Sequence, residues 1–303
     1  MQFNKILVPI DFSEFSDSAV DYALFWGELF GAEVTLLHAL VLHQFETGEE
    51  EHLRAYEKFA RVKEEHMRLE LQRYNQQVSR RRPVTVTSRL IRAVTAADGI
   101  LEEIYNNGYD MVILGTHGRT GLKKWLYGSV AEKVVRLSPI PVLTVHHPVK
   151  RFRVDRILVP VDFSEYSRKA VQAADELRRV FQAQLHFLHV IYPEFHPAYY
   201  VAGIESLFAL DKDLKTRSLE KLREFTGNIN DGAAYTVLEG KPHEEIVNYA
   251  REQDVDLILM ATRGLSGLEH LLIGSTTERV VRLAKMPVLT IERERQKEAS
   301  TEA

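Results

Sequence analysis

The chain repeats a domain-length sequence, and this repeat constrains its fold more than any other feature. The segment KILVPIDFSEFS at residues 5–16 returns as RILVPVDFSEYS at residues 156–167, 151 residues later. Near the end of each copy, PVLTV at residues 141–145 returns as PVLTI at residues 287–291, 146 residues later. Solenoid and propeller units repeat every roughly 20–50 residues, so this period is that of a whole domain.

The length of the chain fits two such domains. It has 303 residues, and a domain has roughly 150. The repeats place the first domain at residues 1–147 and the second at residues 153–293, joined by a short polar segment that contains Pro148. Residues 294–303 are mostly Glu, Lys, Arg, Ser and Thr, and we predict a polar, frayed tail there.

The composition excludes several classes of protein. Hydrophobic residues make up 45% and charged residues 27%, ordinary values for a globular chain. The cysteine count is 0, which excludes disulfides, thiolate metal sites and cysteine nucleophiles and suits a reducing cytoplasm. The formal net charge is -4, and no apolar run approaches the roughly 18 residues of a membrane helix. We therefore expect a cytoplasmic protein that binds neither nucleic acid nor membranes.

Short apolar runs alternate with helical patterns in the first copy. The apolar runs, typical of strands buried on both faces, are residues 6–9, 34–38, 84–90, 111–114 and 142–145. The helical patterns between them are residues 13–30, 53–74, 96–106 and 129–137. Gly31 and Gly108 are predicted to end two of these helices. The alternation predicts an α/β fold of two tandem doubly wound domains, each with a five-stranded parallel sheet and helices on both faces.

Ligands of such sheets bind beyond the carboxyl ends of the strands, so the residues after strands one and four are the candidates. After strand four the sequence reads GTHGRTG, and Gly128 and Ser129 then begin a helix. Glycines allow a close backbone approach, and a helix N-terminus offers free N–H groups and a positive dipole. No G-x-x-x-x-G-K-[ST] motif occurs. The pattern thus indicates a phosphate cradle without a Walker lysine.

The same residues allow a purely structural interpretation. Ser129 and Glu132 match the capping box S-x-x-E, and so do Ser275 and Glu278, and a capping box needs no ligand. Asp11, at a strand-to-helix turn, matches a helix cap.

The histidines show no metal spacing. His38 and His189 end the second strands, and we predict that they pack near the sheet edge rather than bind a ligand.

Taken together, these residues resemble the universal stress protein family in its tandem, nucleotide-binding form. That family carries G-2x-G-9x-G-(S/T) after strand four, which Gly115, Gly118, Gly128 and Ser129 match. The opening strand that ends in Val8-Pro9-Ile10-Asp11 also matches, and the resemblance covers both copies. It implies the sheet order 3-2-1-4-5 and an ATP site between strands one and four.

The resemblance also implies which residues contact the nucleotide. Asp11 would accept a hydrogen bond from adenine or from its neighbouring backbone, Pro9 and Ile10 would line the base pocket, and Val94 would flank it. Ribose and phosphates would be surrounded by Gly115, Thr116, Gly118, Arg119, Gly128, Ser129 and Val130. His117 lies inside the glycine loop and could touch phosphate, and an exposed loop histidine is the alternative. The matching positions of the second copy are Pro160, Val161, Asp162, Gly264, Gly274, Ser275 and Thr276. ADP and AMP are alternatives to ATP, and Mg²⁺ would accompany the nucleotide.

The two copies differ at these positions. Ala261 replaces Gly115, and its Cβ could narrow the approach to the phosphates. After strand three the second copy has Gly240-Lys241-Pro242 where the first has Val94-Thr95-Ala96. We therefore expect unequal sites, with the first copy binding more strongly.

Two function classes follow from these residues, and a third is weaker. The leading hypothesis is an ATP-binding stress-response protein that acts as a nucleotide-responsive regulatory module. The alternative is a scaffold or chaperone-like interaction protein with partly vestigial pockets. The third option is a nucleotide-hydrolysing or nucleotidyl-transferring enzyme. It is weaker because no general base or metal-binding carboxylate pair stands out in the sequence. Any ATP hydrolysis should therefore be slow.

The last strands of the two domains would otherwise be exposed apolar edges, which are prone to aggregate. The resemblance implies that fifth strands meet across a two-fold axis, so the two domains are expected to pack as an internal pseudo-dimer. Two independent domains on a tether are the alternative, and pairing of whole chains into a homodimer stays open.

Overall fold

The computed structural model describes residues 1–42, 50–116, 128–146, 152–192, 206–227, 229, 232–264 and 273–291, with the backbone alone for residues 50–55. The chain divides into two compact units, residues 2–150 and residues 151–303. We describe each unit by itself.

The first unit alternates strands and helices along the chain. Its elements are β1 (Lys5–Pro9), α1 (Glu14–Phe30), β2 (Glu33–Val41), α2 (Glu50–Val78), β3 (Val86–Ala93), α3 (Ala96–Asn107), β4 (Met111–Gly115), α4 (Ser129–Leu137) and β5 (Val142–Val145). All four strand pairs are parallel, and the order is β3-β2-β1-β4-β5. The predicted fold class and the implied order 3-2-1-4-5 are confirmed.

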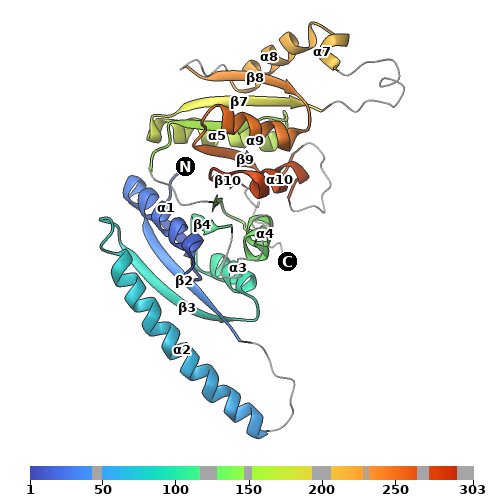
Figure 1. The fold of residues 1–303 in the computed structure, drawn as a ribbon. Helices are drawn as coiled ribbons and strands as arrows, with labels where there is room; N and C mark the ends of the chain where they lie inside the picture. Colours follow the sequence, from blue (N-terminus) through green and yellow to red (C-terminus); the bar gives the residue numbers. More distant parts are fainter. Residues whose placement is uncertain are drawn as a thin grey trace, which may run out of the picture. The chain divides into compact units, whose positions relative to one another are not determined.

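Helices cover both faces of this sheet, with α1 and α2 on one side and α3 and α4 on the other (Figure 1). The central strand β1 buries Ile6, Leu7 and Val8 completely, as expected for a strand covered on both faces. On the α1 side, Trp26 is 1% exposed, and its ring contacts those of Phe3 and Phe30. The core therefore fixes β1, whose carboxyl end lies at the candidate site.

Glycines end two helices where predicted. Gly31 follows α1 with a φ of 69°, and Gly108 follows α3 with a φ of 61°. Both values lie in the left-handed region, which glycine adopts without steric cost.

Polar contacts connect α2 and the turn that follows it to α1. The Tyr74 hydroxyl donates to Asp17 Oδ1 at 2.6 Å, and Arg81 donates to Asp17 at 2.9 Å and to Asp21 at 2.8 Å. Burial, together with the hydrogen bond to Asp17, raises the pKa of Tyr74 well above its usual value. The Tyr74 ring also meets the ring of Phe12 at 5.6 Å, which links α2 to the turn after β1.

The second unit repeats this architecture with an additional short helix. Its elements are β6 (Arg156–Pro160), α5 (Glu165–Phe181), β7 (Gln184–Ile191), α7 (Leu207–Leu210), α8 (Leu214–Phe225), β8 (Ala234–Glu239), α9 (Pro242–Glu252), β9 (Leu257–Ala261), α10 (Ser275–Leu283) and β10 (Val288–Ile291). Its strands are parallel, in the order β8-β7-β6-β9-β10.

Ring contacts, rather than carboxylates, join α8 to the turn after β6. Phe225 of α8 meets Phe163 edge-on at 5.5 Å. Arg168 lies over the ring of Phe225 at 4.2 Å, and Lys221 lies over the ring of Phe163 at 4.2 Å. Both copies thus pack an aromatic ring of the crossover helix edge-on against the turn, and they differ in the charged contacts around it.

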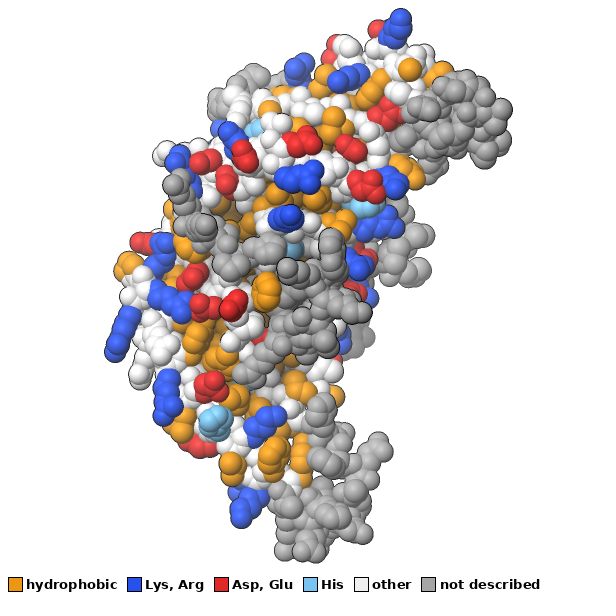
Figure 2. Space-filling view, viewed as in Figure 1, with side chains coloured by type: hydrophobic (Ala, Val, Ile, Leu, Met, Phe, Trp, Pro, Cys, Tyr) orange, Lys and Arg blue, Asp and Glu red, His pale blue; other side chains and the backbone are white. Residues whose placement is uncertain are grey.

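The surface carries both signs of charge. Figure 2 shows basic and acidic side chains interspersed over the visible face of the described residues. On that face they form none of the extended basic stripes that recognise a phosphate backbone. Among the described helices, none is long and apolar enough to span a membrane.

Candidate functional site

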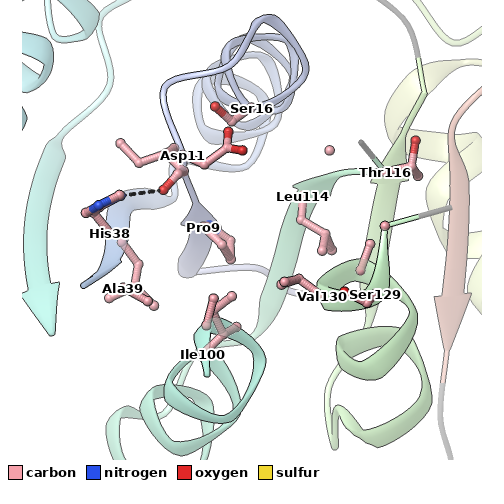
Figure 3. Close-up of a pocket in the computed structure, with 16 residues that line it drawn as sticks. Pro9, Asp11, Ser16, His38, Ala39, Ile100, Leu114, Thr116, Ser129 and Val130 are labelled. Atoms are coloured by element: carbon pink, nitrogen blue, oxygen red, sulfur yellow. Dashed lines mark hydrogen bonds between the residues drawn. The ribbon is translucent and has the colours of Figure 1, made fainter. Parts of the chain in front are cut away.

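A cavity of about 360 Å³ lies beyond the carboxyl ends of β1 and β4 (Figure 3). Its walls come from both strands, from β2, and from the N-terminal turns of α3 and α4. The residues that line it are Pro9, Ile10, Asp11, Ser16, Leu37, His38, Ala39, Ala96, Ile100, Leu114, Gly115, Thr116, Gly128, Ser129, Val130 and Ala131. The cavity lies where the strand order reverses, the usual ligand position in doubly wound sheets.

The structure brings most of the predicted first-copy residues together here. Those that line the cavity are Pro9, Ile10, Asp11, Gly115, Thr116, Gly128, Ser129 and Val130. Val94 does not line it, because its side chain is 71% exposed on the loop after β3. Ala96 and Ile100 of α3 take that place instead. His117, Gly118 and Arg119 lie outside the described residues.

Gly115 serves the packing of α1. A Cβ at this position would lie 2.8 Å from the backbone oxygen of Phe15, closer than real Cβ atoms come. Only glycine therefore lets the end of β4 approach the first turn of α1 so closely. Gly115 does not have a positive φ, so this close approach, and not a left-handed conformation, is what requires glycine here.

The N-terminus of α4 carries no side-chain cap. Gly128 is the N-cap residue, and Ser129 is the first helical residue. The capping-box interpretation is therefore wrong, and it is wrong at Ser275 too, where Gly274 is the N-cap of α10. The helix begins one residue earlier than the box requires, because the Gly128 carbonyl already accepts the N–H of Glu132 at 3.0 Å. Within the described part of the chain, no side chain caps the first N–H groups of α4, and the residues that carry them, Ser129, Val130 and Ala131, line the cavity.

Asp11 is not the cap of α1 either. That cap is Ser13, whose hydroxyl accepts the N–H of Ser16 at 3.2 Å. Asp11 Oδ1 accepts the N–H of Ser13 at 3.1 Å and so shapes the turn before the helix. Phe12 within this turn has a φ of 63°, which is unusual for a residue with a Cβ. The turn therefore places the Asp11 carboxylate at the cavity (Figure 3).

The backbone of β2 extends beyond the end of β1. In β2 the N–H of Glu33 donates to the carbonyl of Asn4, on the side of β1. The N–H of the next residue, Val34, donates to the carbonyl of Thr85, on the side of β3. By this alternation, the N–H and C=O groups of Ala39 face the β1 side. The ladder reaches Ile10, whose N–H donates to the Leu37 carbonyl at 2.8 Å, and stops there. Within the described residues, no group pairs with the N–H of Ala39, which lines the cavity.

His38 contacts the backbone at the point where the ladder stops. Its Nδ1 lies 2.8 Å from the Ile10 carbonyl oxygen, the group that would otherwise accept the N–H of Ala39 (Figure 3). A carbonyl oxygen can only accept, so Nδ1 carries the proton. The imidazole is 9% exposed, and its ring lies 5.0 Å from that of Phe12.

The second copy repeats the arrangement around this histidine. The N–H of Val161 donates to the Leu188 carbonyl at 2.8 Å, and His189 Nδ1 lies 2.7 Å from the Val161 oxygen. Burial lowers the pKa of His189, so this ring is neutral at pH 7. Phe163 has a φ of 65° and packs on the ring of His189 at 4.4 Å.

One ion pair fixes the helices on the other side of the cavity. Lys133 of α4 donates to Asp98 of α3 at 2.5 Å, and this hydrogen bond holds the pKa of the Asp98 carboxyl below its usual range. Thr95 caps α3 by accepting the N–H of Asp98 at 3.2 Å. These contacts hold the α3 and α4 termini that line the cavity in a fixed relation.

In the second copy, the chain after β9 lies close to Asp162. A Cβ on Gly264 would lie 2.4 Å from Asp162 Oδ2, so the chain after β9 lies directly against that carboxylate. Asp162 Oδ1 also accepts both the N–H of Ser164, at 3.0 Å, and its hydroxyl, at 2.6 Å. The remaining predicted residues, Pro160, Val161, Gly274, Ser275 and Thr276, lie at the end of β6 and the start of α10.

Sequence reasoning missed the backbone edge of Ala39 and the role of His38. A peptide group has no side-chain signature, so no motif marks Ala39. The usable signal was the relative length of the first two strands: β2 continues to Val41, while β1 ends at Pro9.

Comparison with known proteins places the chain in a family. The model of the universal stress protein family matches residues 2–146 and 153–292. Universal stress protein MJ0531 of Methanocaldococcus jannaschii is 31% identical over 139 residues, which cover 46% of this chain and 82% of that protein. Universal stress protein YxiE of Bacillus subtilis is 31% identical over 145 residues, 45% of this chain and 98% of that protein.

One solved structure shares the fold over nearly the whole chain. The crystal structure of a universal stress protein from Archaeoglobus fulgidus superposes with a TM-score of 0.70 at 24% identity, covering 97% of this chain and 100% of that one. Since the family model matches both copies from end to end, the chain belongs to the universal stress protein family.

Proposed function

We propose that the first domain binds an adenine nucleotide, ATP in the first instance, and that the chain acts as a nucleotide-responsive regulatory module in the stress response. The observation that carries this proposal is that two features face one cavity. The first is the backbone edge of Ala39, meaning its N–H and C=O, of which the N–H has no partner within the described residues. The second is the N-terminus of α4. A volume of about 360 Å³ lies within the range of small-molecule sites.

The Ala39 edge suits adenine better than guanine. Adenine presents a donor, the N6 amino group, beside an acceptor, N1. The C=O and N–H of one residue are complementary to that pair. Guanine presents an acceptor, O6, beside a donor, N1–H, so each of its groups would meet a like group. Around this edge the walls are apolar, with Pro9, Ile100 and Leu114 directed into the cavity (Figure 3).

The α4 N-terminus suits the phosphates. Its free N–H groups and dipole contribute about 0.3–1 kcal/mol towards an anion, or about 2 kcal/mol when partly buried. Micromolar binding needs about 8 kcal/mol, so the helix terminus alone is insufficient and burial of the base must contribute. The described residues contain no group of three His, Asp or Glu side chains suited to a metal, so Mg²⁺ would enter on the phosphates.

A scaffold with vestigial pockets is the second candidate, and the second copy favours it. There Ala261 stands in place of Gly115. We therefore propose one strong site for each chain, in the first domain, and no rapid turnover of the nucleotide. Release of inorganic phosphate from ATP would test the last point.

Calorimetry with ATP on Ser129→Asp tests the proposal. An aspartate at the first helical position favours the helix dipole, so the domain should stay folded, but its charge would repel the phosphates. We expect ATP to bind the parent with a stoichiometry near one and the variant at least tenfold more weakly. The matched variant Ser275→Asp should bind like the parent. An unchanged affinity in Ser129→Asp would exclude the α4 terminus as the phosphate site.

A further inference from the structure

The Ile10 carbonyl could pair either with the N–H of Ala39 or with His38, and the choice determines whether the Ala39 N–H is available to a nucleotide base. If the parallel ladder between β1 and β2 continued by one step, that carbonyl would accept the N–H of Ala39. The edge facing the cavity would then be internally satisfied. Instead the carbonyl accepts from His38 Nδ1 at 2.8 Å.

His38 holds this carbonyl from a constrained position. The imidazole is buried, and Phe12 packs on it at 5.0 Å from a turn with a φ of 63°. His38 thus contacts the turn on both sides of Asp11: it hydrogen-bonds to Ile10, the residue before, and its ring packs on Phe12, the residue after. A side chain that cannot donate would leave the Ile10 carbonyl without this partner, and the donor that a continued ladder would pair with it is the N–H of Ala39.

The second copy shows that this arrangement is built rather than incidental. His189, Val161 and Phe163 repeat it with distances of 2.7 Å and 4.4 Å, although the surrounding helix contacts are different. Nearby, Arg81 pairs with Asp17 and Asp21 of α1 in the first copy, whereas Arg168 and Lys221 lie over the rings of Phe225 and Phe163 in the second.

From this geometry we infer that His38 is a positioning residue: by engaging the Ile10 carbonyl it keeps the N–H of Ala39 unpaired and so reserves that edge for the base of a nucleotide. The base-binding part rests on the proposed function. The part that concerns the unpaired Ala39 N–H in the protein without nucleotide does not depend on the proposed function.

The test uses His38→Leu, His38→Asn and the second-copy control His189→Leu in the full chain. An asparagine amide can place its N–H close to the position of Nδ1, whereas leucine has a similar size and no donor. Hydrogen exchange of the Ala39 amide is measured without nucleotide. Affinities for ATP and for inorganic tripolyphosphate are measured by calorimetry, and Trp26 emission reports that the first domain is folded.

We expect fast exchange at Ala39 in the parent, in His38→Asn and in His189→Leu. In His38→Leu that amide should exchange at least tenfold more slowly, and ATP should bind at least tenfold more weakly with tripolyphosphate unchanged. Equal exchange of Ala39 in His38→Leu and the parent would overturn the inference, as would slow exchange in His38→Asn. Failure of the parent to bind ATP would instead refute the proposed function and leave the exchange result intact.

Discussion

Alanine at Gly128 should destabilise the first domain much more than alanine at Gly274 destabilises the second. The two glycines hold the same position, each as the N-cap of the helix after the glycine-rich loop. Their surroundings are different. A Cβ on Gly128 would lie 2.9 Å from the Thr116 carbonyl oxygen, whereas a Cβ on Gly274 would lie 3.5 Å from the Thr262 oxygen, an ordinary contact.

These distances set the expected magnitudes. Alanine is a poorer N-cap than glycine, which costs about 1 kcal/mol in both copies. At Gly128 the clash is with backbone that also accepts the N–H of the same residue at 2.8 Å, so neither partner can move freely. Overpacking of this kind costs a further ~1–3 kcal/mol. We therefore expect a loss of about 2–4 kcal/mol at Gly128 and about 1 kcal/mol at Gly274.

Urea unfolding can separate the two domains. Both tryptophans of the chain, Trp26 and Trp125, belong to the first copy, so their emission follows that domain alone. Circular dichroism follows both domains. With an m-value of about 2 kcal/mol/M, Gly128→Ala should lower the emission midpoint by about 1–2 M. Gly274→Ala should leave that midpoint unchanged and shift only a dichroism transition, by about 0.5 M.

The comparison can fail in a clear way. Equal losses in the two variants would show that the cap alone determines the cost and that the loop at Thr116 yields. A larger loss at Gly274 would contradict the packing described for both copies.

Two further predictions concern the second domain and the connection between the domains. Burial lowers the pKa of His186 and of His189 below the usual 6.5, so on acidification the unfolded chain takes up protons first. Their contribution to the stability of the folded domain is complete above about pH 6.5 and falls below that pH. A urea midpoint of the second domain, followed by circular dichroism, that stays constant from pH 7 to 5.5 would contradict this. The internal pseudo-dimer through the fifth strands stays a prediction; if it forms, a flexible insertion between Lys150 and Arg151 should leave the radius of gyration from small-angle scattering unchanged. Expansion in proportion to the insertion would favour tethered domains.

Sequence reasoning predicted the elements that depend on local patterns. Apolar runs predicted the strands. The glycines at 31 and 108 predicted two helix ends, because a left-handed residue at a helix end is usually glycine. The third strand was placed two to three residues too early, at 84–90 rather than Val86–Ala93. It lies at the end of the sheet order, and its alternating burial weakens the continuous apolar run expected of a central strand.

The finer parts of the site depended on tertiary contacts. The start of α4 at Gly128 follows from the bond between that residue and Thr116, twelve residues away across the loop. A capping box describes only four consecutive residues and could not report it. Likewise, Gly115 is required by the backbone of Phe15, which no spacing within the glycine motif reveals.

The two ways of tying a crossover helix to its turn imply different sensitivities to ionic strength. In the first domain, Arg81, just after α2, pairs with Asp17 and Asp21 beside the Phe12–Tyr74 ring contact, and salt screens the attraction of these partly exposed pairs over a few ångströms at 1 M. In the second domain Phe163 and Phe225 pack directly, and concentrated salt does not weaken apolar contact. A cell that accumulates ions under osmotic stress would thus weaken the ion pairs beside α2 while leaving the ring contacts of both halves in place.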